Sequence, residues 1–415
     1  MPESMMQSKA KNWFFLFSSN YLGVVNDNFL KHCIIFTGVT WVMPEHLTHS
    51  TIISLVSAAL IVPYLIFSPL GGRLAVKYSK QKVFRICKLA ELPIMLLATL
   101  AFYCRSVGFS ILAVLLMGIQ SCLYSPSKYG LIRDIGGEKG ISFGNGMFES
   151  MAFLGILSGT VFASLIADHY SFGWVTALFM GFALAGYITT STIRVKESDI
   201  EKTDDTSINP VKFLKESYCF AKNYPNINLG VLGVSIFWLL GGLIQMNLVI
   251  HCTKTLQASN TTAGIIMATA AVGIALGCNL AGRISRGKVH TRMIFFGLAG
   301  MIIFLLGIVI FNPPVVICAL LVFSIAFMGG LFEVPCLAMI QQPDTGRKLG
   351  DMLAYMNLVI FLFVLLGSAV FFITTQFISD NSLIVFAVTA GICLVTFVFF
   401  LAVYNRNGPL AKSGS

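Results

Sequence analysis

Long apolar runs alternate with short polar stretches along almost the whole chain. A helix that crosses a lipid bilayer needs about 20 mostly apolar residues in succession. Such runs occur twelve times, at about 12–42, 51–76, 83–104, 107–132, 142–167, 172–194, 227–252, 258–283, 291–312, 314–341, 349–377 and 382–404. None of them alternates apolar and polar residues as a barrel strand does. We therefore predict an all-α membrane protein with 12 transmembrane helices, each of which bonds its backbone polar groups internally.

The composition agrees with a membrane protein. Of the 415 residues, 56% are hydrophobic and 11% are charged, whereas about a quarter of the residues in a soluble domain are charged. A soluble fold of this length has too little interior to bury that much apolar surface. Lipid must be the solvent for most of the chain.

The basic residues indicate the topology. If the N-terminus lies in the cytoplasm, nearly all of the 28 Lys and Arg residues fall on the cytoplasmic side, including Lys88 near the start of the third helix. Arg105 and Lys254 fall on the other side, and Lys31 and Lys128 lie near or within the membrane. This asymmetry follows the positive-inside rule and predicts that both termini are cytoplasmic. The net charge of +10 thus favours anionic membrane lipids, not nucleic acid, as partners.

One long polar stretch divides the helices into two sets of six. It predicts an N-terminal six-helix bundle over 1–195, a cytoplasmic linker over 196–226 and a C-terminal six-helix bundle over 227–415. After Pro210 the linker spaces its apolar residues at helical intervals beside lysines. This pattern is typical of an amphipathic helix lying on the membrane surface.

The two halves resemble each other. N-D-N-F-L-K-H-C at 26–33 matches Q-M-N-L-V-I-H-C at 245–252, so that Asn28 corresponds to Asn247. We also expect helices 4 and 10 both to end at a proline, Pro126 and Pro335. Two pseudo-symmetric six-helix bundles resemble the major facilitator fold, in which the substrate site lies between the halves near mid-membrane. Helices 1, 4, 7 and 10 are expected to line that site.

Charged residues within the apolar runs are the candidates for chemistry, because a charge at the bilayer centre costs about 2.5 to 3.5 kcal/mol on insertion scales. They are Asp27, Lys31, Glu91, Lys128, Glu149 and Glu333. Asp27 and Lys31 are four residues apart and can pair on one helix face. The pair is either a structural ion pair or part of a polar cavity wall. The second interpretation is favoured because Asn26, Asn28, Gln245 and Asn247 occur at the same depth. These amides have an alternative role in hydrogen bonding between helices.

The remaining acidic candidates have different settings. Glu149 lies in the glycine-rich segment GNGMFES and is either a ligand for substrate or cation or a partner for Lys128. Glu333 precedes Pro335, where we expect a broken helix with freed carbonyl groups. Glu91 precedes Pro93 in a helix that is often peripheral in this fold, which favours a structural role.

The sequence offers no catalytic chemistry. The ten cysteines lie mostly inside apolar runs without a C-x-x-C pair, which predicts buried thiols with no disulfide or metal. No nucleophile triad or cluster of metal ligands is present either. We therefore expect a protein that is not an enzyme and needs no cofactor.

Several motifs carry a resemblance to one family across the whole chain. They are NDNFLK (26–31), YSPSKYGLI (124–132), GNGMFES (144–150), GVSIFWLLGG (233–242) and FMGGLFEVPCLAMIQQ (327–342). In this order they resemble the bacterial lysophospholipid transporter family. The resemblance implies a flippase that moves lysophospholipids from the outer to the inner leaflet of the bacterial cytoplasmic membrane by alternating access. We also expect a monomer, and any acyltransferase or acyl-carrier-protein ligase partner is expected to be a separate protein.

The same resemblance assigns cavity roles to Asp27, Lys128, Tyr129 and Glu149. The candidate substrate site then comprises Asp27, Asn28, Lys31, Lys128, Tyr129, Glu149, Gln245, Asn247 and Glu333. Two residues depart from the pattern. Gln245 stands where the family has an arginine, and Val76 stands where major facilitator proteins have an aspartate after helix 2.

Two other functions fit the sequence. One is a cation-coupled exporter or importer of a small amphiphile, such as a drug or siderophore, with Asp27 or Glu149 as the proton site. The other is a membrane scaffold for a lipid-modifying enzyme that transports nothing itself. Translocation of a fluorescent lysolipid into vesicles of purified protein separates these functions.

The topology can be tested by cysteine labelling. In a background without other cysteines, one cysteine replaces Ser198 in the linker and another replaces Ser106 between helices 3 and 4. An impermeant thiol reagent should reach the two from opposite sides of the membrane, since an odd number of crossings separates them. Labelling of both from outside the cell would overturn the predicted orientation.

Overall fold

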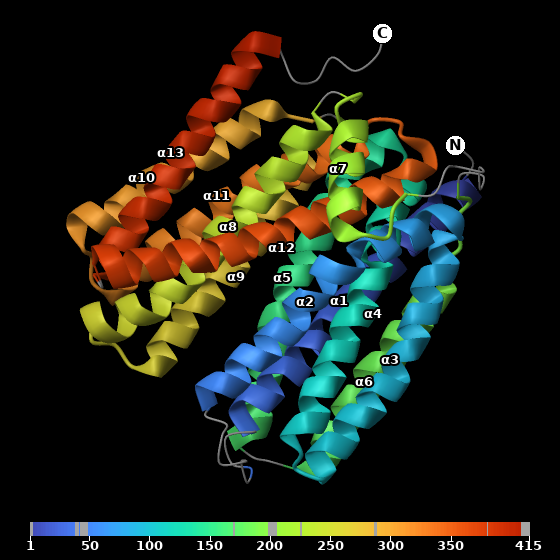
Figure 1. Ribbon diagram of the computed structural model, residues 1–415, viewed down its shortest axis with the longest axis horizontal. Helices are drawn as coiled ribbons and strands as arrows, with labels where there is room; N and C mark the ends of the chain where they lie inside the picture. Colours follow the sequence, from blue (N-terminus) through green and yellow to red (C-terminus); the bar gives the residue numbers. More distant parts are fainter. Residues whose placement is uncertain are drawn as a thin grey trace. The chain divides into compact units, whose positions relative to one another are not determined.

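The computed structural model describes residues 3–37, 41, 49–168, 171–197, 206–224, 226–285, 289–379 and 381–407. Regular structure in these ranges is helical throughout (Figure 1). The α-helices are α1 (Glu3–Thr37), α2 (His49–Lys77), α3 (Lys80–Tyr103), α4 (Val107–Gly136), α5 (Ile141–Asp168), α6 (Phe172–Thr192), α7 (Pro210–Ala221), α8 (Ile227–Ile250), α9 (Asn260–Ile284), α10 (Thr291–Phe311), α11 (Val315–Gln341), α12 (Leu349–Ile373) and α13 (Ser382–Asn407). The predicted all-helical membrane fold is confirmed.

Each of the twelve predicted segments coincides with a long helix, α1 to α6 and α8 to α13. Eleven of these, α2 to α6 and α8 to α13, are long and apolar enough to cross a membrane. The remaining helix, α1, has 35 residues, but polar residues such as Asn20, Asn26, Asp27 and Lys31 interrupt its apolar sequence. The short helix α7 lies in the predicted linker. Residues 198–205 of that linker, Ser198 among them, fall outside the described residues.

Close contacts divide the chain into two compact units. Unit 1 comprises Met1–Gly137, Leu154–Cys219 and Thr345–Leu358, and unit 2 comprises Glu138–Phe153, Phe220–Asp344 and Val359–Ser415. The beginning of α5 therefore belongs to unit 2 and its remainder to unit 1, whereas the beginning of α12 belongs to unit 1. The bundle boundaries expected from the sequence stay a prediction.

Small residues allow the helices of unit 1 to approach closely. Within it, α4 packs against α1, α2 and α3, and α6 packs against α1 and α3. A Cβ atom at Gly71 of α2 would lie 2.8 Å from the carbonyl oxygen of Cys122, and one at Gly118 of α4 would lie 2.8 Å from that of Ala59. Glycine at both positions therefore fixes the spacing of α2 and α4. Such crossings are typical of membrane helices, where van der Waals packing replaces the hydrophobic effect between helices.

Unit 2 is organised around α11, which packs against α8, α9 and α10. Gly330 of α11 approaches the backbone of α9 so closely that a Cβ atom there would lie 2.6 Å from the Cys278 nitrogen. The predicted break at Pro335 is wrong, because α11 continues to Gln341, and Pro126 likewise lies inside α4. Membrane helices tolerate an internal proline, because neighbouring helices and local adjustments can satisfy the freed backbone groups.

The cysteines are free, as the sequence suggested. Cys33, Cys122, Cys278, Cys318 and Cys393 are buried within apolar helices, and so are Cys252 and Cys336. Cys87 is half-buried, while Cys104 and Cys219 are exposed. The predicted burial is therefore confirmed for most of these thiols.

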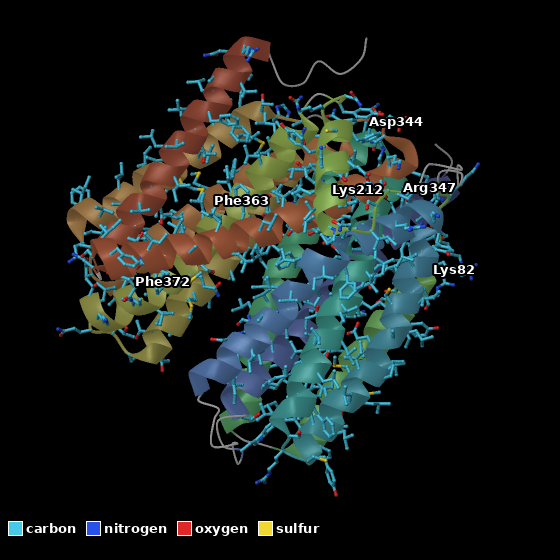
Figure 2. The ribbon with its side chains drawn as sticks, viewed as in Figure 1. Lys82, Lys212, Asp344, Arg347, Phe363 and Phe372 are labelled. Carbon is cyan, nitrogen blue, oxygen red and sulfur yellow. The ribbon has the colours of Figure 1, made fainter. Side chains whose placement is uncertain are left out.

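Glu197, which follows α6, bonds to the start of α3 and to Arg347. Its carboxylate accepts hydrogen bonds from the backbone nitrogens of Lys80 and Gln81 at 2.7 and 3.0 Å and from the Ser79 hydroxyl at 2.7 Å. It thus caps the first turn of α3, where the helix dipole favours a negative charge. Arg347, labelled in Figure 2, lies just before α12 and places its Nη1 atom 3.4 Å from Glu197 Oε2. One carboxylate thereby joins three segments of unit 1.

These hydrogen bonds control the ionisation of Glu197. Burial by itself would raise the pKa of Glu197, but hydrogen bonds from Gln81, Ser79 and Lys80 outweigh it and hold that pKa below the usual value of 4.5. A carboxyl group whose pKa is lower in the folded state stabilises the fold above its unfolded pKa. That stabilisation is lost as the pH falls through the folded pKa.

We expect Glu197→Gln to lower the free energy of unfolding near neutral pH by about 1 to 3 kcal/mol, since it removes a charge that accepts several hydrogen bonds. Thermal unfolding of the detergent-solubilised protein measures the effect, and the difference from the unchanged protein should shrink as the pH falls below 4.5, the usual pKa of a glutamate. Glu216→Gln is the control, because Glu216 forms only an exposed ion pair with Lys212 at 3.8 Å besides one hydrogen bond from Ser207. Equal stability at pH 7, or a difference that persists in acid, would contradict the assignment.

Candidate functional site

A set of polar side chains lies inside unit 1 where α1, α3 and α4 meet. Helix α1 supplies Asn26 and Asp27, α3 supplies Lys88 and Glu91, and α4 supplies Ser121, Tyr124 and Lys128. We call these seven residues the polar cluster. Helix α1 packs against α4 at this point.

Asp27 points toward α4. The Ser121 hydroxyl donates a hydrogen bond to Asp27 Oδ2 at 3.1 Å. The charged groups that act on Asp27 are Glu91, Lys88 and Lys128. Lys31 is not among them, and in the described part of the chain no ion pair joins Asp27 to Lys31. The predicted pairing along the helix is therefore wrong, because Asp27 turns toward Ser121 while the charge of Lys31 acts on its neighbour His32.

Lys128 is half-buried and carries the second candidate charge. Its Nζ atom donates to Asn20 Oδ1 at 3.2 Å. The same atom lies 5.3 Å from the centre of the Tyr124 ring and 5.6 Å from that of Tyr129. Cation–π attraction of this kind holds an ammonium group in place beside the two rings.

Lys88 and Glu91 form an ion pair inside the cluster. Lys88 Nζ lies 2.6 Å from Glu91 Oε2, and both side chains are 1% exposed. Asn26 donates its Nδ2 proton to Glu91 Oε1, also at 2.6 Å. The sequence places Lys88 among the basic residues of the cytoplasmic side, but the structure buries its side chain within α3. Its spacing of three residues from Glu91 on one helix was the available signal.

Of the predicted site residues in unit 1, Asp27, Lys128 and Tyr129 come together around the polar cluster. Asn28 instead donates its Nδ2 proton to the carbonyl oxygen of Val24 at 2.9 Å, within its own helix. Sequence reasoning missed Lys88, Ser121 and Tyr124. Serine and tyrosine gave no signal, because both occur throughout membrane helices without functional roles.

Unit 2 holds the other predicted residues, in two settings. Glu333 on α11 is 1% exposed and accepts hydrogen bonds from the Cys278 thiol at 3.8 Å and from the Trp238 indole. The charged group that acts on it most is Glu149, which is 2% exposed. Two buried carboxyl groups thus lie within electrostatic range of each other.

The amides of α8 do not share one role. Asn247 is buried and donates its Nδ2 proton to the carbonyl oxygen of Ser382 at 2.9 Å, which joins α8 to α13. Gln245, two residues earlier, is exposed. The hydrogen-bonding alternative therefore describes Asn247.

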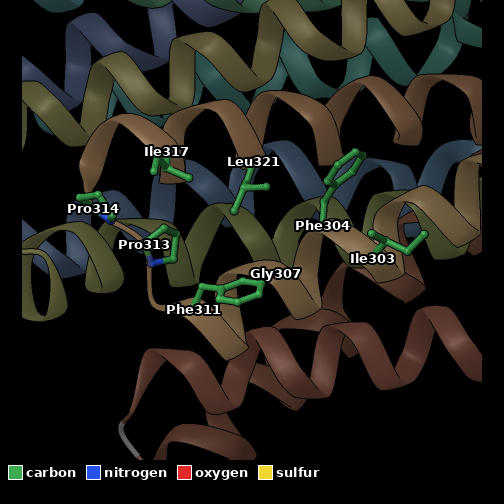
Figure 3. Close-up of a pocket in the computed structure, with 8 residues that line it drawn as sticks. All are labelled: Ile303, Phe304, Gly307, Phe311, Pro313, Pro314, Ile317 and Leu321. Atoms are coloured by element: carbon green, nitrogen blue, oxygen red, sulfur yellow. The ribbon is translucent and has the colours of Figure 1, made fainter.

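Unit 2 also contains an apolar groove between α10 and α11 (Figure 3). Its volume is about 500 Å³, and it is lined by Ile303, Phe304, Gly307, Phe311, Pro313, Pro314, Ile317 and Leu321. These residues present no charged or polar side chain, so they can accommodate an alkyl chain but cannot recognise a head group.

Comparison with known proteins identifies the family. Residues 28–368 match the family described as the Major Facilitator Superfamily. The chain belongs to that superfamily. Major facilitator proteins are membrane transporters, so this multi-pass protein is a secondary transporter and not an enzyme.

Solved major facilitator structures share its fold. A human organic anion transporter superposes with a TM-score of 0.75 at 15% identity, covering 94% of this chain and 99% of that one. The fucose:proton symporter of E. coli superposes with a TM-score of 0.70 at 16% identity, covering 95% and 99%. At such identities the likeness concerns the fold alone.

Curated relatives of this major facilitator protein include bacterial lysophospholipid transporters. The one from Photorhabdus laumondii subsp. laumondii is 24% identical over 307 residues, which is 72% of this chain and 73% of the relative. The one from Serratia proteamaculans is 24% identical over 305 residues, covering 72% and 74%. These similarities are distant but extend over most of both chains.

Proposed function

We propose that this major facilitator protein is a lysophospholipid flippase of the bacterial cytoplasmic membrane. The observation that carries the proposal is the position of Asp27 and Lys128, two opposite charges that flank Tyr124 and Ser121 inside unit 1. The distant similarity to lysophospholipid transporters supports the same substrate class. Both termini and the linker are proposed to be cytoplasmic.

The chemistry of a lysophosphatidylethanolamine head group suits the polar cluster. The ammonium group carries N–H donors that a carboxylate accepts, and Asp27 already accepts one hydrogen bond from Ser121. The phosphate carries oxygens that a lysine ammonium binds by charge-assisted hydrogen bonds. A zwitterion can therefore bind with its ammonium toward Asp27 and its phosphate toward Lys128. Each charge is expensive in lipid, and the opposite charge of the head group offsets part of that cost.

Transport is proposed to follow alternating access, in which the two halves of a major facilitator protein rock around a central site. Asn28, Lys31 and Tyr129 are proposed to border the head-group site. Glu149 of α5 and, from the C-terminal half, Gln245, Asn247 and Glu333 are also proposed to take part in substrate binding. The flippase acts as a monomer, with any enzyme that reacylates the lipid a separate protein.

A second function is favoured by one observation in unit 2. Glu149 and Glu333 lie within electrostatic range of each other and are almost fully buried. Buried acidic side chains in a transporter can interact with a coupling cation, because a charge in a medium of low dielectric constant favours an opposite charge nearby. Such a pair suits a cation-coupled transporter of a small amphiphile.

The lysolipid proposal predicts that both charges of the head-group site are required. In proteoliposomes of purified protein, Asp27→Asn and Lys128→Ala should each reduce fluorescent lysolipid translocation about tenfold or more, because a charge-assisted contact is lost in a site with little water. Lys128→Arg should retain more activity than Lys128→Ala, since a phosphate ligand remains. Lys82→Ala, at an exposed lysine, is the control. Unchanged lipid binding and translocation in well-inserted Lys128→Ala would refute the proposal.

Neutralising the carboxyl pair separates the two functions. If the protein is a passive flippase, Glu149→Gln and Glu333→Gln should change mainly its lipid affinity, and an imposed pH gradient should leave the rate unaltered. A proton-coupled carrier should instead lose gradient-driven uptake while keeping exchange. Lysolipid uptake measured with and without the gradient distinguishes the outcomes. If the unchanged protein accumulates lysolipid in response to the gradient and these two variants do not, coupling is favoured.

A further inference from the structure

Two lysines lie beside the same tyrosine ring in the polar cluster. The centre of the Tyr124 ring is 5.6 Å from Lys88 Nζ and 5.3 Å from Lys128 Nζ. Both lysines also act electrostatically on Asp27. A phosphate group entering this region therefore meets two potential cationic ligands. The two lysines differ in their surroundings, because Lys88 is held in an ion pair with Glu91.

Lys88 is held and neutralised by its surroundings. Its Nζ atom is 2.6 Å from Glu91 Oε2, and Asn26 fixes the other carboxylate oxygen of Glu91. Gly23 of α1 makes room for it, since a Cβ atom there would lie 2.5 Å from Lys88 Nζ, and Gly186 of α6 also borders it, at 3.6 Å for a Cβ atom. Four helices thus accommodate one buried ion pair.

Stability alone does not account for such an arrangement. The desolvation of two buried charges often cancels their mutual attraction, so apolar residues of similar size serve stability equally well. The ion pair does, however, set the charge beside Asp27 and Tyr124. Without Glu91, the Lys88 ammonium would face Asp27 directly and would compete with a substrate ammonium for it.

We propose that Glu91 determines the head-group charge preference of the transporter by neutralising Lys88. The inference rests on the proposed lysolipid function, because it takes Asp27 and Lys128 as the head-group site. Glu91 and Lys88 are positioning residues that act through Asp27 and Tyr124. With Lys88 neutralised, Asp27 receives the substrate ammonium and Lys128 receives the phosphate. With Lys88 released, the site gains positive charge and favours lipids whose head group is anionic overall.

The test compares two lipids in the same proteoliposomes, neutral zwitterionic lysophosphatidylethanolamine and anionic lysophosphatidylglycerol. Glu91→Gln should raise the ratio of anionic to zwitterionic transport about tenfold, as one unit charge a few ångströms away does in a protein interior. Lys88→Gln should lower that ratio, because it leaves the Glu91 carboxylate without its cation. The double variant Lys88→Gln, Glu91→Gln should restore the original ratio.

Asp134→Asn provides a matched control. It releases Lys80 from the other buried ion pair on α3, in which Lys80 Nζ lies 2.7 Å from Asp134 Oδ2. Lys80 begins α3, two helical turns before Lys88, and it acts on neither Asp27 nor Tyr124. The lipid ratio should therefore stay unchanged in this variant even if its stability falls.

The outcomes are distinguishable. A merely structural pair would lower transport of both lipids equally, and a constant ratio in Glu91→Gln and Lys88→Gln would overturn the inference. If neither single variant inserts, the exchanged pair Lys88→Glu, Glu91→Lys retains both charges and places the carboxylate beside Tyr124, where it should lower the ratio; no change would again overturn the inference. Failure of the unchanged protein to move either lipid would instead refute the proposed function.

Discussion

The energetic cost of charge in a lipid environment governs the interior of unit 1. Lys80, Lys88, Glu91 and Asp134 are all buried or nearly so, and each finds an opposite charge within 2.7 Å. A charge within these helices needs a partner in the protein, either on the same helix, as for Lys88 and Glu91, or on a neighbouring one, as for Lys80 and Asp134. The polar cluster is the result, and its members determine how α1, α3 and α4 face one another.

Helix packing and electrostatics depend on each other in this arrangement. Gly23 matters because the space that a side chain would fill is occupied by the Lys88 ammonium. Gly71 and Gly118 bring α2 within contact of the α4 backbone, and α4 in turn carries Tyr124 and Lys128. Small residues therefore set the spacing of α2 and α4 and leave room for the Lys88 ammonium beside α1.

The fold followed from the sequence because hydrophobicity and length are local properties. All twelve apolar segments correspond to helices, and these segments alone were nearly sufficient to predict the fold class. The site was predicted in part. Asp27 and Lys128 stood out because a charge in an apolar run is rare, whatever its partner.

What the sequence could not provide was the direction in which each side chain points. Asp27 and Lys31 share a helix spacing that permits pairing, yet Ser121 on another helix attracts Asp27 instead. Lys88 was assigned by its distance from the end of a helix, and its burial depends on glycines far away in the sequence. Pro126 and Pro335 illustrate the same limit, because neighbouring helices, absent from any local pattern, support the backbone around them.

The distribution of thiols gives this protein two native sites for chemical labelling. Of its ten cysteines only Cys104, just after α3, and Cys219, on α7, are exposed. A water-soluble maleimide therefore has two preferred targets in the unmodified chain, and they lie at opposite ends of the proposed topology. Fluorophores attached to these native sulfurs can follow the two faces of the transporter separately, with no residue replaced.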